Sequence, residues 1–206
     1  MIQKSVESII KYAEETLKTA EFGLNDLINA HPERKLAGLR NLVVFGRAVT
    51  NVLQNLRSIE PGFNEWYEKY VKEMREDPLM KYFYKLRSQI LKEGVLKTIP
   101  TAHVKKLDFP DDMDKLRKTA PPNAKKFFIG DEYGGSGWEI QLPDGSLEKY
   151  YVELPSNIGY VTLHLPKAPK YHLGKKVEDD SIQNLAKLYI EYLRKMVLDA
   201  KQEFLK

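Results

Sequence analysis

The segment 81–94, KYFYKLRSQILKEG, carries a single arginine, Arg87, that could hold a phosphate group. Its helical spacing places Arg87 on a stripe beside the buried face. The buried face comprises Leu79, Phe83, Leu86 and Ile90, and the stripe beside it comprises Met80, Tyr84, Arg87 and Leu91. A half-buried guanidinium requires an acceptor. Arg87 is therefore expected to meet a carboxylate or carbonyl within the protein, or a phosphate on a ligand.

A second polar stripe lies on an otherwise apolar helical segment. Its members, at helical spacings of seven, four, three and four, are Arg40, Arg47, Asn51, Gln54 and Ser58. Gly46 in the same segment costs about 1 kcal/mol against alanine, which indicates close approach by another helix or by a ligand. One interpretation is that Arg47, Asn51 and Arg87 line a ligand-binding cleft. The alternative is a solvated face beside a tight helix crossing.

The histidines and the absence of cysteine argue against a metal site. No two of His31, His103, His164 and His172 stand at metal-ligand spacing. We therefore expect no metal and no cofactor. His164 is predicted to face solvent or a partner from its strand. His172, which precedes the last helix, is the histidine that could complete a site with Arg87 in space.

Two further segments attract attention but favour structural interpretations. DFPDDMDK at 108–115 lacks the glycine and terminal glutamate of a calcium loop, and it is typical of a helix start. GDEYGGSGW at 130–138 opens into a strand and not into a helix, so a hairpin loop is favoured over a phosphate-binding loop. Trp138, with Tyr150 and Tyr151, could stack bases or fill a sheet core.

Composition sets broad limits on the class of protein. The chain has 206 residues, no cysteine and a formal net charge of +4. It contains no apolar run long enough for a membrane span and no signal-peptide pattern at its start. We therefore expect a cytoplasmic protein with no membrane association. The charge permits an RNA or nucleotide partner without requiring one.

The elements that must position these residues are mostly helices. Apolar periodicity predicts helices over 6–28 and 33–58, a third around Trp66–Met74, and a fourth that holds Arg87. Asp77 is predicted to cap the fourth helix, with Pro78 in its first turn. Gly94 is predicted to end that helix in the left-handed conformation.

The middle of the chain changes to alternating, proline-rich segments. Residues 98–177 are predicted to form a small antiparallel sheet of three or four strands, with a turn at 143–146. Residues 178–206 follow as one long amphipathic helix that must dock on the N-terminal helices to bury its apolar side. We therefore expect a single domain over 1–206, with a helical bundle at 1–97 and the β-rich segment as its insertion.

The N-terminal helices resemble the HEPN superfamily of helical bundles. Active members resemble metal-independent RNases, and their motif is an arginine, usually followed by a polar residue, with a histidine at a total gap of four to six residues. Here Arg87 and Ser88 are followed by Lys92, Glu93 and Gly94 at the histidine positions. The resemblance also implies a homodimer across the motif helices, with two copies of Arg87 around one groove.

The missing histidine bears on activity. RNA cleavage through the 2′-hydroxyl needs a proton acceptor and donor near neutral pH, and histidine has a reference pKa of about 6.5. Lysine, with a reference pKa of about 10.4, stays protonated unless it is buried. Arg87, Lys92 and His172 are thus the catalytic candidates if the chain is an enzyme.

These observations lead to one preferred interpretation and two alternatives. We expect a mainly α fold: a HEPN-like helical bundle with a small antiparallel β-sheet insertion and a long C-terminal helix that completes the bundle. The preferred function is binding of RNA or a nucleotide, or regulation through a protein partner, without nuclease activity, in a stress, toxin–antitoxin or phage-defence setting. The alternatives are a metal-independent endoribonuclease with a non-standard proton-transfer residue, and a purely structural or interaction protein.

Overall fold

The computed structural model describes residues 5–105, 108 and 110–205, which form two compact units. The first, here called the helical unit, comprises the described residues within 1–96 and 167–206. The second, here called the β unit, comprises those within 97–166. Each unit has its own core, so each is described by itself.

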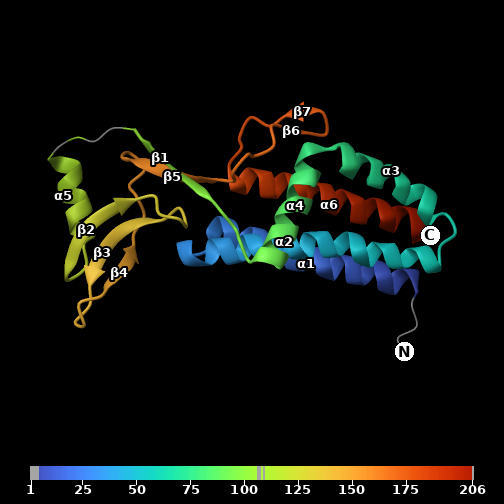
Figure 1. Cartoon of the computed structure of the whole chain (residues 1–206), viewed down its shortest axis with the longest axis horizontal. Coiled ribbons are helices and arrows are strands. Elements are labelled where there is room, and N and C mark those ends of the chain that lie inside the picture. The colour runs from blue at the N-terminus through green and yellow to red at the C-terminus, as the bar shows by residue number, and fades with distance from the viewer. Residues whose placement is uncertain (1–4, 106–107, 109, 206) are drawn as a thin grey trace. The chain divides into compact units, whose positions relative to one another are not determined.

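The helical unit contains the longest helices of the chain. In order, its elements are α1 (Val6–Asn29), α2 (Pro32–Leu53), the 3-10 helix η1 (Gln54–Ser58), α3 (Phe63–Glu76), α4 (Pro78–Glu93), the short hairpin strands β6 (Tyr171–His172) and β7 (Lys175–Lys176), and α6 (Ile182–Phe204). Within this unit α1 packs along α2, and α6 contacts α1, α2 and α4 (Figure 1). Helical periodicity explains the buried faces, because apolar residues three and four apart share one side of each helix.

Two glycines allow α1 and α2 to touch along their backbones. A Cβ atom at Gly23 would lie 2.6 Å from the carbonyl oxygen of Gly38, and one at Gly38 would lie 2.7 Å from the carbonyl oxygen of Gly23. Real Cβ atoms do not approach backbone atoms so closely. The pair therefore fixes how α2, which carries Arg47, sits against α1.

The helix ends follow the local chemistry of the sequence. Asp77 caps α4 by accepting a hydrogen bond from the Met80 amide at 2.8 Å, and Pro78 occupies the first helical turn. Gly94 ends α4 with a φ angle of 67°. These three predictions are confirmed. The predicted helix over 33–58 is α2 continued by η1.

The β unit contains one helix and five strands within its described residues. They are β1 (Ile99–Val104), α5 (Asp111–Lys118), β2 (Ala124–Ile129), β3 (Ser136–Gln141), β4 (Leu147–Tyr151) and β5 (Gly159–His164). Strands β2, β3 and β4 form an antiparallel sheet in that order, whereas β1 pairs with β5 in a separate antiparallel ribbon. The strand predicted around residues 159–164 thus pairs with a segment some 60 residues earlier in the chain.

The core of the β unit lies between α5 and the three-stranded sheet. Leu116, Trp138 and Ile158 are its buried residues. The Trp138 indole N–H donates to the Thr119 hydroxyl at 3.1 Å, so its polar atom is satisfied. The predicted acidic start of the helix at 108–115 is seen in α5, although Phe109 lies outside the described residues.

Residues 130–135 of the glycine-rich segment 130–138 form the turn between β2 and β3, as predicted, and the remaining residues begin β3. The centre of the turn is Asp131, whose Oδ1 accepts hydrogen bonds from the backbone amides of Tyr133 and Gly135. The other oxygen accepts from the Tyr151 hydroxyl at 2.6 Å and from Lys149 Nζ at 3.0 Å. Burial alone would raise the pKa of Asp131, but these hydrogen bonds outweigh it and lower the pKa. The loop is therefore held by one carboxylate.

The predicted fold class is wrong. The structure is a mixed α/β fold with three antiparallel sheets, and not a mainly α helical bundle with a small insertion. The physical reason is that the alternating segments of the middle block bury their own core against α5. Residues 167–177, assigned from the sequence to the β-rich segment, group with the helical unit. The single domain over 1–206 stays a prediction.

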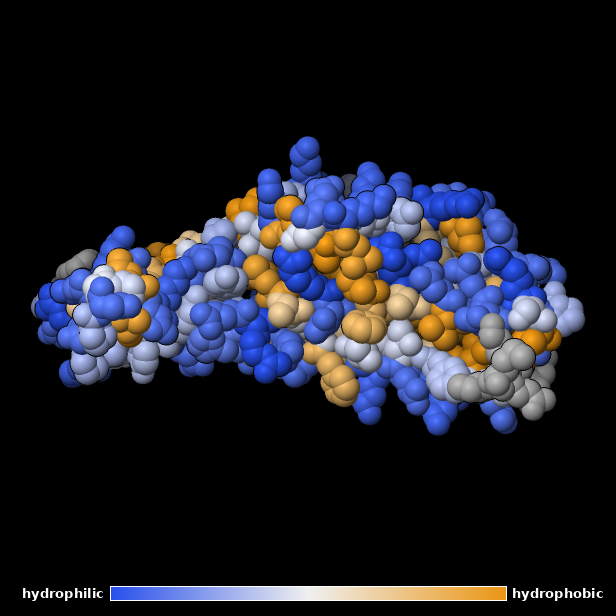
Figure 2. Space-filling view, turned by 60° about the horizontal axis from the view of Figure 1, so that its bottom comes forward, coloured by the Kyte–Doolittle hydropathy of each residue, from blue (hydrophilic) through white to orange (hydrophobic). Residues whose placement is uncertain are grey.

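On the face drawn in Figure 2, hydrophilic residues predominate and hydrophobic residues are interspersed among them. Among the described residues, none of the helices combines the length and apolar character that crossing a bilayer requires.

Candidate ligand-binding cleft in the helical unit

Four α-helices and the 3-10 helix η1 of the helical unit surround a cleft of about 670 Å³. This volume is in the range of sites that hold small molecules. The lining residues come from α2 and η1 (Arg47, Thr50, Gln54, Arg57), from α3 (Tyr67, Glu68, Val71, Met74, Arg75), from α4 (Met80, Lys81, Tyr84) and from α6 (Tyr189, Leu193). We call this site the arginine cleft.

The inner wall of the arginine cleft is built on Gly46 and Tyr189. A Cβ atom at Gly46 would lie 2.5 Å from Cε1 of Tyr189 and 3.1 Å from its hydroxyl oxygen. The Tyr189 ring also stacks on Phe83 of α4, with centroids 4.3 Å apart and planes 4° from parallel. The close approach predicted from Gly46 is therefore confirmed, and the neighbour is a side chain of α6.

Arg47 lines this cleft without an acidic partner. Its Nη1 donates to the Thr50 hydroxyl, one helical turn further along α2, and its guanidinium carbon lies 6.0 Å from the Tyr84 ring centroid. The residue is half-buried, and the described residues provide no ion pair for it. A guanidinium has five N–H donors, so Arg47 keeps donors for a ligand.

The charges around the arginine cleft are predominantly positive. Four lining side chains are cationic, namely Arg47, Arg57, Arg75 and Lys81, whereas Glu68 is the acidic one. Burial raises the pKa of the Tyr189 hydroxyl, against the opposing charges of Arg47 and Arg87. Both arginines therefore place positive potential at the inner wall, where a neutral phenol faces them.

The residues predicted for the cleft are only partly brought together. Arg47 lines it, and Thr50 and Gln54 of the same helix line it where Asn51 was expected. Asn51 is exposed and is not among the lining residues. Arg87 is half-buried and also does not line the cleft, but its charge acts on Tyr189 from nearby.

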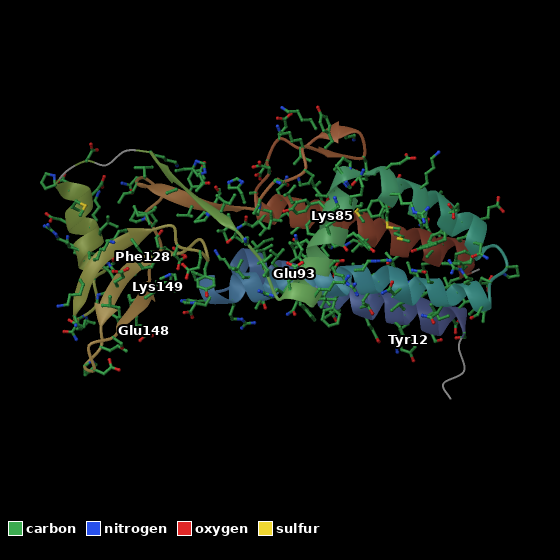
Figure 3. All side chains as sticks on the ribbon, in the orientation of Figure 1. Tyr12, Lys85, Glu93, Phe128, Glu148 and Lys149 are labelled. Atoms are coloured by element: carbon green, nitrogen blue, oxygen red, sulfur yellow. The ribbon has the colours of Figure 1, made fainter. Side chains whose placement is uncertain are left out.

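The catalytic candidates lie at opposite ends of α4. Lys92 is exposed near the C-terminal end, next to Glu93, which Figure 3 labels at that end of the helix. His172 lies at the N-terminal end, where its Nδ1 and Asp77 Oδ1 are 3.1 Å apart. Arg87 follows Asp77 by ten residues, about 15 Å along a helix that rises 1.5 Å per residue. The structure therefore does not bring His172 beside Arg87.

Several lining residues were not identified from the sequence. Tyr67, Met74 and Arg75 belong to α3, and Tyr189 and Leu193 belong to α6, more than 100 residues later. The helical spacing of Met74 and Tyr189 is that of core residues. Only the packing of α3 against α4 and η1, and of α6 against α2 and α4, shows that these faces border a cleft.

The arginine cleft has the chemistry of a binding site. No lining residue is a histidine or a cysteine. Throughout the part of the chain that the structure describes, no group of three or more metal-ligating side chains occurs. The lining can donate hydrogen bonds to an anion and pack on an apolar ring, but it has no group that exchanges protons readily near neutral pH.

Comparison with known proteins gives one match. Residues 30–109 match the family described as bacteriophage lambda protein ea47. No curated protein and no solved structure matches the chain. The matched residues include α2, α3 and α4, which hold most of the arginine cleft.

This match corrects the recognition made from the sequence. The segment that carries Arg87, Ser88 and Lys92 lies within residues 30–109, and the family that matches there is the ea47 family and not HEPN. The resemblance to HEPN proteins is therefore wrong. It depended on one arginine, a following polar residue and a helical periodicity, and amphipathic helices of unrelated proteins share all three.

Proposed function

We propose that the helical unit binds an anionic ligand that carries a planar ring, namely a nucleotide or a short stretch of RNA, in the arginine cleft. The observation that carries the proposal is Arg47, a half-buried guanidinium without an acidic partner in the described structure. Burying such a group is unfavourable unless its donors are used. A phosphate oxygen is the acceptor that a guanidinium matches best in geometry.

The remaining lining suits the rest of such a ligand. Tyr67, Tyr84 and Tyr189 supply aromatic rings, and Met74 and Met80 supply adaptable apolar contacts. Tyr84 is more than half exposed (58%) and the Arg47 guanidinium lies 6.0 Å from its ring, so a base could pack beside the charge. Arginines with exposed aromatic rings are a recurring combination in nucleic-acid recognition.

The proposed role is binding or regulation and not cleavage by this cleft, because the lining offers no imidazole for proton transfer. The similarity of residues 30–109 to a bacteriophage lambda protein favours a phage-related setting. The homodimer and the protein partner expected from the sequence stay predictions. The purely structural alternative differs in one respect, since it requires that Arg47 has no ligand at all.

Ligand binding is tested by thermal unfolding in the presence of nucleotides and RNA oligomers. A ligand at 100 times its dissociation constant adds about 2.7 kcal/mol to the free energy of unfolding. We expect a nucleotide or oligomer to raise the melting temperature of the native chain. Arg47→Ala should weaken its binding by roughly 10- to 100-fold, because hydrogen bonds to charged groups contribute about 1.5–3 kcal/mol.

The control variant is Arg117→Ala, which removes an exposed arginine of α5 that pairs with Asp114 at 3.3 Å. It should bind the ligand as the native chain does. The absence of any shift with every nucleotide and RNA tested would favour the structural alternative. Equal binding by the native chain and Arg47→Ala would place the ligand outside the arginine cleft.

A further inference from the structure

The hydroxyl of Tyr189 is a buried polar group at the inner wall of the arginine cleft. Tyr189 belongs to α6, is 4% exposed and lines the cleft. Its ring is fixed by the stack on Phe83 and by the close approach of Gly46. Within the described structure its hydroxyl makes no hydrogen bond. A phenylalanine would fill the same space with no polar group to desolvate, so the hydroxyl indicates an acceptor that enters the cleft.

The charges near this hydroxyl select the kind of atom that it meets. Burial raises the pKa of the Tyr189 hydroxyl, against the opposing charges of Arg47 and Arg87. The hydroxyl therefore keeps its proton and can donate it to a ligand. Because two guanidinium charges act at the same position, negative charge on the accepting atom is favoured.

Arg47 is held at the wall of this cleft by Thr50. The Thr50 hydroxyl donates to the Arg47 carbonyl oxygen at 2.9 Å and accepts from Nη1 of the Arg47 guanidinium. Thr50 is itself buried, so these two hydrogen bonds fix the orientation of the guanidinium. They use one of its five N–H donors, and the others remain for a ligand.

The two guanidiniums lack a carboxylate that would balance their charge. Arg47 and Arg87 are both half-buried, and neither has a salt bridge among the described residues. A phosphate monoester at the end of a nucleotide carries about −1.5 to −2 charges at pH 7, whereas a phosphodiester within a nucleic-acid chain carries one. The terminal phosphate therefore matches the two guanidinium charges better than an internal phosphodiester does.

The burial of the inner wall also favours the end of a ligand over its middle. Tyr189 is almost fully buried, and Leu193 beside it in the lining is fully buried. An internal phosphodiester is bonded to a ribose on each side, so it needs room for the chain in two directions. A terminal phosphate has one such bond and can reach this wall while its nucleoside stays near the exposed ring of Tyr84.

We propose that the inner wall of the arginine cleft binds the terminal phosphate of a nucleotide, with the Tyr189 hydroxyl and Arg47 as its direct donors. Arg87 contributes charge and not a hydrogen bond, since it does not line the cleft. This proposal rests on the proposed function and narrows it, because it selects a phosphorylated end over the interior of an RNA chain. A free nucleotide and the 5′-phosphorylated end of an RNA share this chemistry.

The test is isothermal titration of the full chain with matched pairs of probes. Nucleoside 5′-mono-, di- and triphosphates are compared with their nucleosides, and an RNA oligomer with a 5′-phosphate is compared with the same oligomer with a 5′-hydroxyl. We expect the phosphorylated member of a pair to bind about 10-fold or more tightly than the other. Binding of the nucleotides alone identifies a free nucleotide as the ligand, whereas binding of the phosphorylated oligomer alone identifies an RNA end.

The decisive variant is Tyr189→Phe, which removes the hydroxyl and keeps the ring that stacks on Phe83. It should weaken the binding of the phosphorylated probe by roughly 10-fold and reduce the preference for phosphorylation. The matched control is Tyr192→Phe, which removes another buried hydroxyl of α6 that does not line the cleft. This control should bind as the native chain does, and thermal unfolding without ligand shows whether both variants are folded.

The outcomes separate this proposal from the proposed function. Binding that depends on Arg47 but is equal within each pair of probes would overturn the terminal-phosphate site and leave the binding of nucleotides or RNA intact. An unchanged affinity of the folded Tyr189→Phe chain for the phosphorylated probe would also overturn it. The absence of binding by every probe would overturn both.

Discussion

At the scale of single residues, Gly46 and Tyr189 form a close contact at the inner wall of the arginine cleft. Alanine favours a helix over glycine by about 1 kcal/mol, so Gly46→Ala would be stabilising on an isolated helix. In this protein the added Cβ would lie 2.5 Å from Tyr189 Cε1. We expect a loss of about 1–3 kcal/mol in the free energy of unfolding, as is typical of overpacking. Urea denaturation measures it.

A matched control is Gly62→Ala, since Gly62 has open space around its Cβ position and a negative φ angle. This variant should change the free energy of unfolding by less than about 1 kcal/mol. If Gly46→Ala proved as stable as Gly62→Ala, the inner wall of the cleft would be adaptable and its shape would not depend on Gly46.

Part of the arginine cleft could be predicted from the sequence, residue by residue. Arg47 stood out because a charge on a mostly apolar helix is unusual, and Gly46 stood out because glycine is unfavourable there. Asn51 and Arg87 were grouped with them by spacing alone, which fixes the face of a helix but not the neighbour of that face. Tyr67 and Tyr189 could not be found, because a core tyrosine and a cleft tyrosine have the same periodicity.

At the scale of elements, Asp77 joins a helix end to a hairpin. It caps α4 through the Met80 amide, accepts from the Leu173 amide at 2.6 Å, and pairs with His172. Its side chain is buried, with 2% exposed. Burial alone would raise the pKa of Asp77, but the hydrogen bonds from His172, Leu173 and Met80 outweigh it and lower the pKa.

This lowered pKa predicts how stability depends on pH. A carboxyl group whose pKa is lower in the folded chain stabilises it above the pKa of the unfolded chain, near 3.8. This stabilisation is lost as the pH falls through the pKa that Asp77 has in the folded chain. We expect Asp77→Asn to be less stable than the native chain by about 1–3 kcal/mol at pH 7, and the difference to narrow below pH 4. Urea denaturation at several pH values measures it.

The control for this prediction is Glu76→Gln, which neutralises the exposed neighbouring residue. Its free energy of unfolding should differ little from that of the native chain at each of these pH values. A constant difference between Asp77→Asn and the native chain from pH 7 to pH 2.5 would contradict the account, since it would mean that the Asp77 charge is not what holds the hairpin.

Element ends and turns were predictable because their causes are local. Asp77, Pro78 and Gly94 act within a few residues of the helix that they begin or end. The pairing of β5 with β1 was not predictable, since about 60 residues separate the partners. A period-two pattern predicts a strand but does not specify its neighbour in the sheet. The contact of His103 with the Thr162 hydroxyl, at 2.9 Å, depends on that pairing and was not predicted.

At the scale of the whole molecule, the predicted fold class was wrong because helical periodicity dominates the sequence, and the strand pattern alone does not show that the strands build a core of their own. Alternation in the middle block correctly indicated β-strands. It did not show that Leu116 of α5 would cover Trp138 and complete a second core. The chain therefore has one core among its long helices and another beneath a sheet.

Each unit contains one of the two tryptophans, which makes the two cores separately observable. Trp66 reports on the helical unit and Trp138 on the β unit. Leu116→Ala removes a side chain that is 2% exposed, and buried leucine truncations cost about 2–5 kcal/mol. In a Trp66→Phe background, we expect this variant to shift the urea midpoint of Trp138 fluorescence downward.

The same experiment in a Trp138→Phe background tests whether the two cores are energetically independent. With Trp138→Phe, the fluorescence of Trp66 should keep its urea midpoint when Leu116→Ala is added, because Leu116 packs within the β unit. Leu56→Ala, which truncates a fully buried leucine of the helical unit, should show the reverse pattern. A shift of both midpoints by the same amount in either variant would mean that the two cores unfold as one cooperative domain, as the sequence analysis expected for residues 1–206.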